Sequence, residues 1–114
     1  MAGALYWLFM NRAEFVQRLV LNAICDDFEN VDQVILPEVA EQGSKCWLKI
    51  DRAEVVAALT ALVHAGMAKA YDLGTDRTYF YSTESGRALH QSDAAWWPFD
   101  DEGELRRDWS PPGP

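Results

Sequence analysis

Five basic residues in the middle of the chain have the type and spacing of a set that could bind phosphates. Cations that neutralise phosphates and release their counterions supply much of the affinity of proteins for nucleic acid. The five candidate DNA-contacting residues are Lys45, Lys49, Arg52, Lys69 and Arg77. They alternate with Asp51, Glu54, Asp72 and Asp76. That pattern is also typical of a solvated surface of mixed charge, so the sequence leaves both interpretations open.

A second group of residues has the types that perform catalysis or bind metals. His64, His90, Cys25 and Cys46 are the only histidines and cysteines of the chain. No pair among them has the close spacing of a zinc-binding motif. The chain also lacks a glycine-rich phosphate loop, a Gly-x-Ser-x-Gly elbow and an HExxH motif. We therefore expect a protein that is not an enzyme and that uses no metal or cofactor.

Large apolar side chains near both ends could form a surface for protein association. We expect the segment Leu5 to Met10 to pair with a second copy, although it could also pack on its own domain or extend the first helix. Trp96, Trp97 and Phe99 lie beside acidic residues, which suits docking on a partner, while folding of Trp96 and Trp97 over the domain is equally open. The candidate association residues are Leu5, Tyr6, Trp7, Leu8, Phe9, Met10, Trp96, Trp97 and Phe99.

Length and charge set further bounds. With 114 residues, of which 49% are hydrophobic, the chain can form one small domain with a modest core. Its net charge of −8 disfavours non-specific attraction to nucleic acid. The last 23 residues hold six acidic and two basic side chains, which is half of that net charge. The two cysteines lack CxxC spacing, and no apolar run reaches the roughly 18 residues of a membrane span, so we expect a cytoplasmic protein with free thiols and no membrane partner.

The first half of the chain predicts two helices and a strand. A first helix is expected from Arg12 to Asp27, because Asn11 with an acidic residue three positions later resembles a capping box. A shorter helix is expected between Asp32 and Gln42, although Pro37 leaves two forms open. Either the helix is kinked and covers the whole span, or residues 34–36 are extended and Pro37 opens a helix that ends at Gly43. The alternating residues 46–50 predict a strand that pairs with a later hairpin.

The second half predicts a third helix, a hairpin and a final helix. The third helix is expected from Asp51 to Ala65, ending at Gly66, where a left-handed cap suits glycine. Strands follow from Met67 to Leu73 and from Thr78 to Ser82, and Thr83 is the expected N-cap of the final helix. The apolar stripe of the third helix is expected to consist of Val55, Val56, Leu59, Leu62 and Val63.

This half resembles the winged helix-turn-helix superfamily. The residues that carry the resemblance are Val56-x-x-Leu59-x-x-Leu62-Val63-x-x-Gly66-Met67 and then Tyr79-x-Tyr81-Ser82-Thr83-x-x-Gly86-Arg87. Bacterial regulators of this fold often show a helix, a glycine, a strand and then Tyr-x-Leu-Thr-x-x-Gly, so Ser82 stands where leucine is common. The resemblance covers about residues 12 to 91. It implies an α+β, mostly helical fold, namely a winged helix with a three-helix core, a β-hairpin wing and a short C-terminal helix.

The resemblance also implies an organisation and two possible functions. An apolar N-terminal segment (1–11) would precede the winged-helix domain (12–91), and an acidic and aromatic tail (92–114) would follow it. In most members the third helix enters the DNA major groove and the wing contacts the backbone or minor groove. Here the exposed face of that helix would present Arg52, Ala57, Ala58, Ala61 and His64, which offers little to read bases. We therefore expect association with itself as a homodimer or with another protein, and the alternative is a DNA-binding transcriptional regulator.

Overall fold

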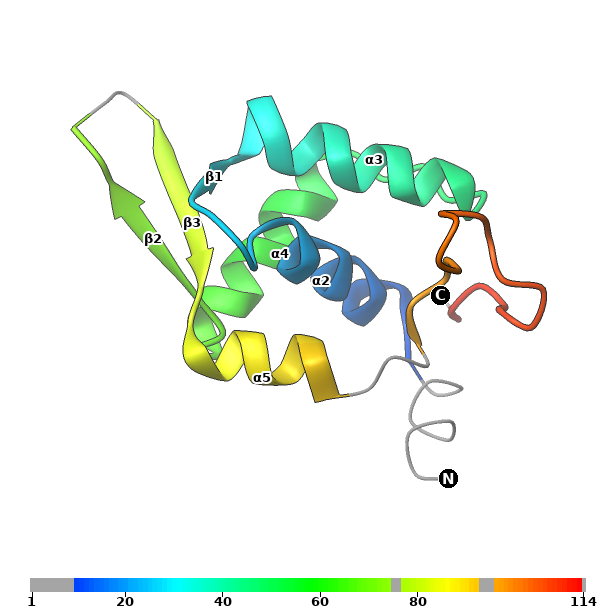
Figure 1. Ribbon diagram of the computed structural model, residues 1–114. Coiled ribbons are helices and arrows are strands. Elements are labelled where there is room, and N and C mark those ends of the chain that lie inside the picture. Colours follow the sequence, from blue (N-terminus) through cyan, green and yellow to red (C-terminus); the bar gives the residue numbers. More distant parts are fainter. Residues whose placement is uncertain (1–9, 75–76, 93–95, 114) are drawn as a thin grey trace.

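The computed structural model describes residues 10–74, 77–92 and 96–113, which form four α-helices and a three-stranded antiparallel sheet (Figure 1). The α+β class expected from the sequence is confirmed. The helices are α2 (Arg12–Ala23), α3 (Leu36–Lys45), α4 (Arg52–His64) and α5 (Glu84–Ser92), and a π-helical turn, η1 (Val31–Ile35), leads into α3. The strands are β1 (Glu29–Asn30), β2 (Ala68–Asp72) and β3 (Thr78–Ser82), in the order β1-β3-β2.

Helix α2 begins where its cap predicts and ends earlier than expected. The side chain of Asn11 accepts a hydrogen bond of 2.8 Å from the backbone N–H of Glu14. The expected end at Asp27 is wrong, because the helix stops at Ala23. The carbonyl of the next residue, Ile24, accepts a hydrogen bond of 3.1 Å from Ser82 of β3. Attachment to the sheet therefore competes with continuation of the helix.

The second helical segment runs through Pro37 without a break. Residues 31–35 form η1, and Leu36 donates its N–H to the carbonyl of Val31, which is the wider spacing of a π-turn. Pro37 then lies in the first turn of α3, where proline is common. The form that covers the whole span is confirmed and the extended form of residues 34–36 is wrong. The helix also continues past Gly43 to Lys45.

Residues 46–50 do not form the expected strand. After the C-cap Cys46, the backbone of Trp47 adopts a left-handed conformation with φ of 58°, which turns the chain away from the helix axis. Ile50 is then buried in the core. The third place in the sheet belongs to β1, whose Glu29 and Asn30 lie opposite Phe80 and Tyr79 of β3.

The hairpin and the final helix follow the expected order. Gly66 ends the α4 segment with φ of 76°, a conformation that favours glycine. Strands β2 and β3 pair in the register that places Ala70 opposite Phe80. Thr83 accepts a hydrogen bond of 3.1 Å from the N–H of Gly86, so its expected role as an N-cap is confirmed.

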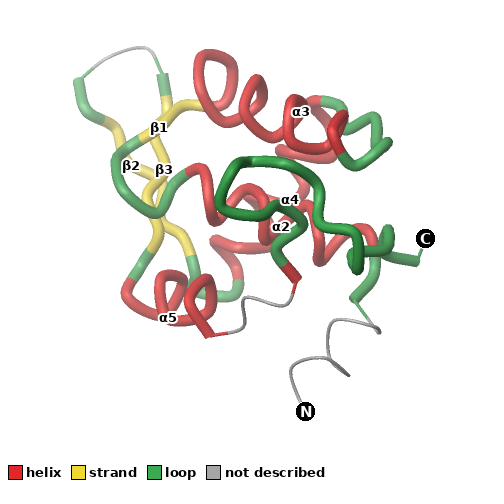
Figure 2. The backbone as a smooth tube through the Cα atoms, turned by 45° about the vertical axis from the view of Figure 1, so that its right-hand side comes forward, coloured by secondary structure: helices red, strands yellow, loops and turns green. Residues whose placement is uncertain are grey.

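The core lies between the helices and is closed by the C-terminal segment. In Figure 1 the strands gather at one end of the molecule and residues 96–113 lie at the other, and in Figure 2 this C-terminal segment passes in front of α2 and α4. Phe15 of α2 contacts both Trp96 and Trp109, with ring centroids 6.3 and 5.5 Å apart. None of the helices in the described ranges has the length and apolarity needed to cross a membrane.

Candidate association surface around α4

The position of α4 follows from its cap and from one buried face. Asp51 caps the helix by accepting a hydrogen bond of 2.9 Å from the N–H of Glu54. Val55, Leu59 and Leu62 are buried against the core. The opposite face of α4 is exposed, and it carries Ala53, Val56, Ala57, Thr60, Val63 and His64.

Two expectations about this helix are wrong. Val56 and Val63, placed in the buried stripe, are 37% and 38% exposed, whereas Ala58, placed on the exposed face, is buried. The sequence could have predicted that the two valines are exposed. Neighbours on a helix point about 100° apart, so a narrow buried stripe cannot hold both members of the pairs Val55–Val56 and Leu62–Val63. Val55 and Leu62 take the inner positions of those pairs.

An apolar groove runs between α4 and the sheet. It encloses about 260 Å³. Val56 and Val63 form its helical side, and Ala70 with Phe80, which are opposite each other in the sheet, form its other side. The lining residues are Val31, Val56, Leu59, Thr60, Val63, His64, Ala70 and Phe80. His64 is the only residue of this set that can carry a charge, so the groove favours apolar side chains.

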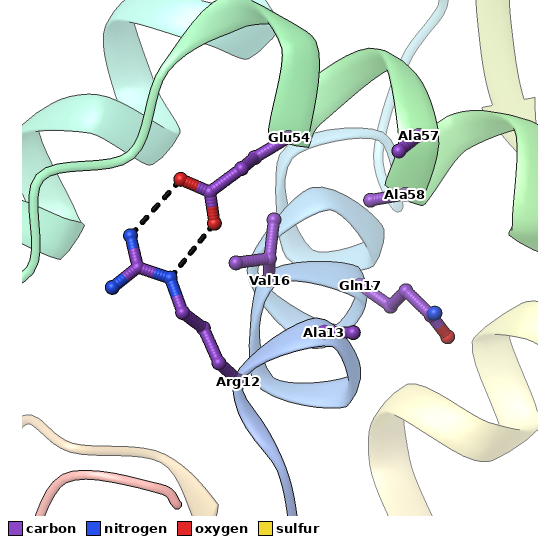
Figure 3. Close-up of a pocket in the computed structure, with 7 residues that line it drawn as sticks. All are labelled: Arg12, Ala13, Val16, Gln17, Glu54, Ala57 and Ala58. Atoms are coloured by element: carbon purple, nitrogen blue, oxygen red, sulfur yellow. Dashed lines mark hydrogen bonds and ion pairs between the residues drawn. The ribbon is translucent and has the colours of Figure 1, made fainter. Parts of the chain in front are cut away.

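A second groove lies on the other side of α4, against α2 (Figure 3). It encloses about 350 Å³ and is lined by Arg12, Ala13, Val16, Gln17, Glu54, Ala57 and Ala58. Two hydrogen bonds, of 2.8 and 2.9 Å, join Arg12 to the carboxylate of Glu54 at one end of this groove. Arg12 also donates to the carbonyl of Lys49 at 2.7 Å. The carboxylate raises the pKa of Arg12, which therefore fixes α2 to the start of α4 as a permanent cation.

The basic residues expected to contact DNA do not form one continuous set. Arg52 donates to Asp32 at 2.9 Å, and this hydrogen bond lowers the pKa of Asp32. The charge of Arg77 also lowers the pKa of Asp32, as the smallest of the contributions. Asp32 therefore interacts with two of the five residues, directly with Arg52 and through its charge with Arg77.

Two of the other three lie elsewhere. The ammonium of Lys69 lies 5.4 Å from the ring of Tyr71. Both residues are neighbours of Ala70 in β2, and Ala70 faces α4. Because successive side chains of a strand point to opposite faces, Lys69 lies on the sheet face turned away from α4. Lys45 ends α3, about 15 Å along the helix from its start, and its ammonium lies 5.7 Å from the ring of Phe99. Lys49 is exposed between α3 and α4. The expected phosphate-binding track is therefore interrupted.

The aromatic residues expected to form an association surface belong largely to the core. Trp96 is 1% exposed, Phe99 and Met10 are also buried, and Trp97 is half-buried with its ring 5.2 Å from that of Trp96. Folding of this segment over the domain is confirmed, and docking of Trp96 or Phe99 on a partner is wrong for the conformation described. The residues Leu5, Tyr6, Trp7, Leu8 and Phe9 lie outside the described residues.

The groups with reactive side chains do not converge on a site. Burial raises the pKa of Cys46 to about 11, and it also raises the pKa of Cys25. Both cysteines are free thiols. His90 is half-buried beside Trp96, and burial lowers its pKa. In the part of the chain that the structure describes, no three residues of the types His, Cys, Asp and Glu are grouped as metal ligands would be.

Comparison with known proteins adds no relative to this description. No protein-family model, no curated protein and no solved structure matches the chain significantly.

Proposed function

We propose that this chain is a non-enzymatic winged-helix module that acts through protein association, as a homodimer, and not through DNA. The order of elements supports the fold part of the proposal. A helix, a short strand, two helices and a β-hairpin follow one another, and the short strand pairs with the second strand of the hairpin. In this proposal α4 is the third helix of the core, and β2 with β3 is the wing. A cytoplasmic location belongs to the same proposal.

The exposed face of α4 is the observation that favours association with protein over binding of DNA. That face would meet DNA in a DNA-binding member of the superfamily. Here it is a row of small and apolar side chains between two apolar grooves, with Val56 and Val63 more than a third exposed. Phosphate neutralisation needs cations, whereas apolar grooves beside a helix suit the side chains of a protein partner.

The rival function, DNA-binding transcriptional regulation, has one feature in its favour. Arg52 begins α4, Arg77 directly precedes β3, and the charges of both act on the carboxylate of Asp32. In the rival, this pair would contact phosphates. Asp32 opposes that role, because it is paired with Arg52 and its carboxylate repels the phosphate that the cations would attract.

Two measurements on the full chain separate the two functions. Fluorescence anisotropy of a mixed-sequence DNA duplex is followed during titration with the protein at low salt and again at physiological salt. Low salt gives any phosphate contact its greatest strength. Sedimentation equilibrium over a wide concentration range gives the oligomeric mass.

We expect a dimer mass and no duplex binding at either salt concentration. A monomer that binds the duplex at low salt and releases it at physiological salt would support the rival. The variant Arg52→Ala with Arg77→Ala is the control, because it removes the pair that the rival requires and should then abolish the binding. A monomer that binds no DNA would contradict the homodimer directly.

A further inference from the structure

Trp47 is the most exposed large hydrophobic residue in the described part of the chain. It lies in the connection between α3 and α4, and its side chain is 79% exposed. Tryptophan is among the residues that most often supply the binding energy of protein interfaces, because it buries a large rigid area at little entropic cost. An isolated exposed tryptophan is therefore a candidate anchor residue of a protein interface.

The backbone of Trp47 is held in a conformation that favours glycine. Its φ of 58° makes it the only residue other than glycine with a positive φ in the described ranges. The N–H of Leu48 donates to the carbonyl of Gly43 at 2.8 Å and the N–H of Trp47 donates to that of Ser44 at 3.1 Å, which is the Schellman pattern at the end of α3. Glycine commonly occupies the position of Trp47 in this motif, since a Cβ is disfavoured there. The motif therefore presents a bulky side chain outward at a conformational cost.

The surface beside Trp47 combines a hollow with two cations. A shallow cavity of about 460 Å³ is lined by Ala40, Ser44, Trp47, Leu48, Lys49 and Ile50. Lys45 and Lys49 lie two residues before and after Trp47, and both side chains are exposed. This surface, which we call the Trp47 face, consists of the hollow with Trp47, Lys45 and Lys49. It therefore suits a partner that offers carboxylates.

An acidic turn lies directly beside the Trp47 face. Lys45 is 5.7 Å from the ring of Phe99, and the next residues, 100–104, form a turn closed by a hydrogen bond of 2.8 Å from the N–H of Asp100 to the carbonyl of Glu104. The side chain of Asp100 accepts two backbone hydrogen bonds of 3.0 Å inside this turn. Asp101, Glu102 and Glu104 are exposed. The turn thus holds three outward carboxylates in a fixed loop.

These opposite charges do not neutralise each other within one chain. Among residues 10–74, 77–92 and 96–113, no ion pair joins Lys45 or Lys49 to any carboxylate of the acidic turn. A basic aromatic face next to an acidic turn can complement a copy of itself, because a two-fold axis places each face of one copy against the turn of the other. At physiological ionic strength, charges more than about 8 Å apart are largely screened. The attraction between a face and a turn in close contact is therefore stronger than the repulsion between the net negative charges of the two copies.

We propose that the Trp47 face binds the acidic turn 100–104 of a second copy, so that two such contacts form a symmetric dimer. The inference rests on the homodimer of the proposed function and assigns its surface. Trp47 inserts beside the partner's turn, and Lys45 and Lys49 pair with the carboxylates of that turn. Both grooves of α4 belong to neither half of this contact and stay available to another protein.

A charge exchange tests the pairing by sedimentation equilibrium. One variant carries Lys45→Glu and Lys49→Glu, and the other carries Asp101→Lys and Glu102→Lys. Each variant alone sets like charges against each other in both halves of the contact and should dimerise on the order of tenfold more weakly than the unaltered chain. In an equal mixture, the acidic face of one variant meets the basic turn of the other, and the second contact keeps its original charges. The mixture should therefore recover dimers with an affinity close to that of the unaltered chain.

A single substitution tests the anchor without a risk to the fold. Trp47→Gly removes the side chain and suits the left-handed backbone, so at concentrations where both chains are monomeric its unfolding midpoint should equal or exceed that of the unaltered chain. Its dimer should nevertheless be at least about tenfold weaker, as for an interface anchor. Leu73→Ala, at another exposed hydrophobic residue in the connection after β2, is the matched control and should leave the dimer unchanged.

Three results would overturn the inference. An unaltered chain that is monomeric would remove both this inference and the proposed homodimer. Dimers that persist in Trp47→Gly but disappear when residues 1–9 are deleted would keep the homodimer and move its interface to the N-terminal segment. A mixture of the two charge variants that recovers no dimer would exclude the pairing of the face with the turn.

Discussion

Arg12 and Arg52 illustrate, at the scale of single residues, why a count of cations overstates how well a surface binds phosphate. Each guanidinium donates to a carboxylate within the chain, Arg12 to Glu54 and Arg52 to Asp32. Such exposed or half-exposed pairs contribute little to stability, so a stronger anion can compete for the cation. The carboxylate, however, remains nearby and repels an incoming phosphate. The local surface therefore acts as if it were close to neutral.

His90 should make stability depend on pH. Its imidazole is half-buried, and burial together with the charge of Arg18 lowers its pKa from the ordinary value of 6.5, while Asp26 acts in the opposite direction. Between the lowered pKa and 6.5 the unfolded chain binds more protons at this group than the folded chain. The contribution of His90 to stability is thus fully present above about pH 6.5 and is lost as the pH falls through the lowered pKa.

Urea unfolding at several pH values between neutral and mildly acidic measures this contribution. We expect His90→Gln to lose less stability on acidification than the unaltered chain does. His64→Gln, which removes the other imidazole and leaves His90 in place, should keep the original dependence. Equal slopes for His90→Gln and the unaltered chain would show that His90 does not contribute to it.

At the scale of elements, a single threonine joins α4, the hairpin and α5. The hydroxyl of Thr83 donates to the carbonyl of Gly66 at 2.6 Å and accepts from the N–H of Gly86 at 3.1 Å. Its backbone N–H donates to the carbonyl of Met67 at 2.9 Å. The end of α4, the start of β2 and the first turn of α5 therefore meet at one point, which fixes where the hairpin leaves α4.

Gly86 is required at this junction because of the space available and not because of its backbone angle. A Cβ at this position would overlap the backbone carbonyl oxygen of Met67. Since neither backbone can yield without breaking the Thr83 contacts, we expect Gly86→Ala to destabilise the protein by about 3 kcal/mol or more. Thermal or urea unfolding followed by circular dichroism measures the change.

Ser85→Ala, next to Gly86 and exposed on α5, is the control and should change stability by less than about 0.5 kcal/mol. A Gly86→Ala variant as stable as this control would contradict the close approach of α5 to Met67.

At the scale of the whole molecule, the two ends of the described chain are parts of one core. The N–H of Arg12 donates to the carbonyl of Gly113 at 2.8 Å, and Asn11 pairs with Gly113 as a parallel bridge. Trp96 and Trp109 enclose Phe15 of α2, and buried Arg18 lies 5.9 Å from the ring of Trp96. Residues 96–113 therefore complete the packing of α2.

Trp109→Ala tests whether this segment unfolds together with the helices. Trp109 is buried against Phe15, and its truncation would leave a large cavity there. We expect a loss of about 3–5 kcal/mol in the free energy of unfolding, as is typical for truncation of a buried tryptophan. Urea unfolding followed by both tryptophan fluorescence and circular dichroism measures the loss and shows whether the two transitions coincide.

Leu73→Ala serves as the control for loss of an exposed apolar side chain and should change stability by less than about 0.5 kcal/mol. An unaltered unfolding free energy in Trp109→Ala would place the C-terminal segment outside the cooperative unit.

Local chemistry in the sequence determined the starts of α2, α4 and α5, the hairpin and the α+β class. Asn11, Asp51 and Thr83 cap helices because their side-chain oxygens accept nearby backbone N–H groups, and Gly66 ends α4 because it tolerates a positive φ. These interactions span a few residues, so neighbours in the sequence are sufficient to predict them. The sequence also predicted that α4 has no cation-rich face.

Only the tertiary structure decided which partners distant residues meet. Residues 46–50 alternate between apolar and polar side chains as a strand does. The free edge of β3, however, can pair with only one further strand, and Glu29 with Asn30 of β1 occupies that edge. Val56 and Val63 are apolar enough for the core, but the groove between α4 and the sheet leaves them exposed. Trp96 and Trp109 contact Phe15 of α2, which lies 81 and 94 residues earlier in the chain, respectively. Such contacts depend on shape and on competition for limited buried surface, which no short stretch of sequence contains.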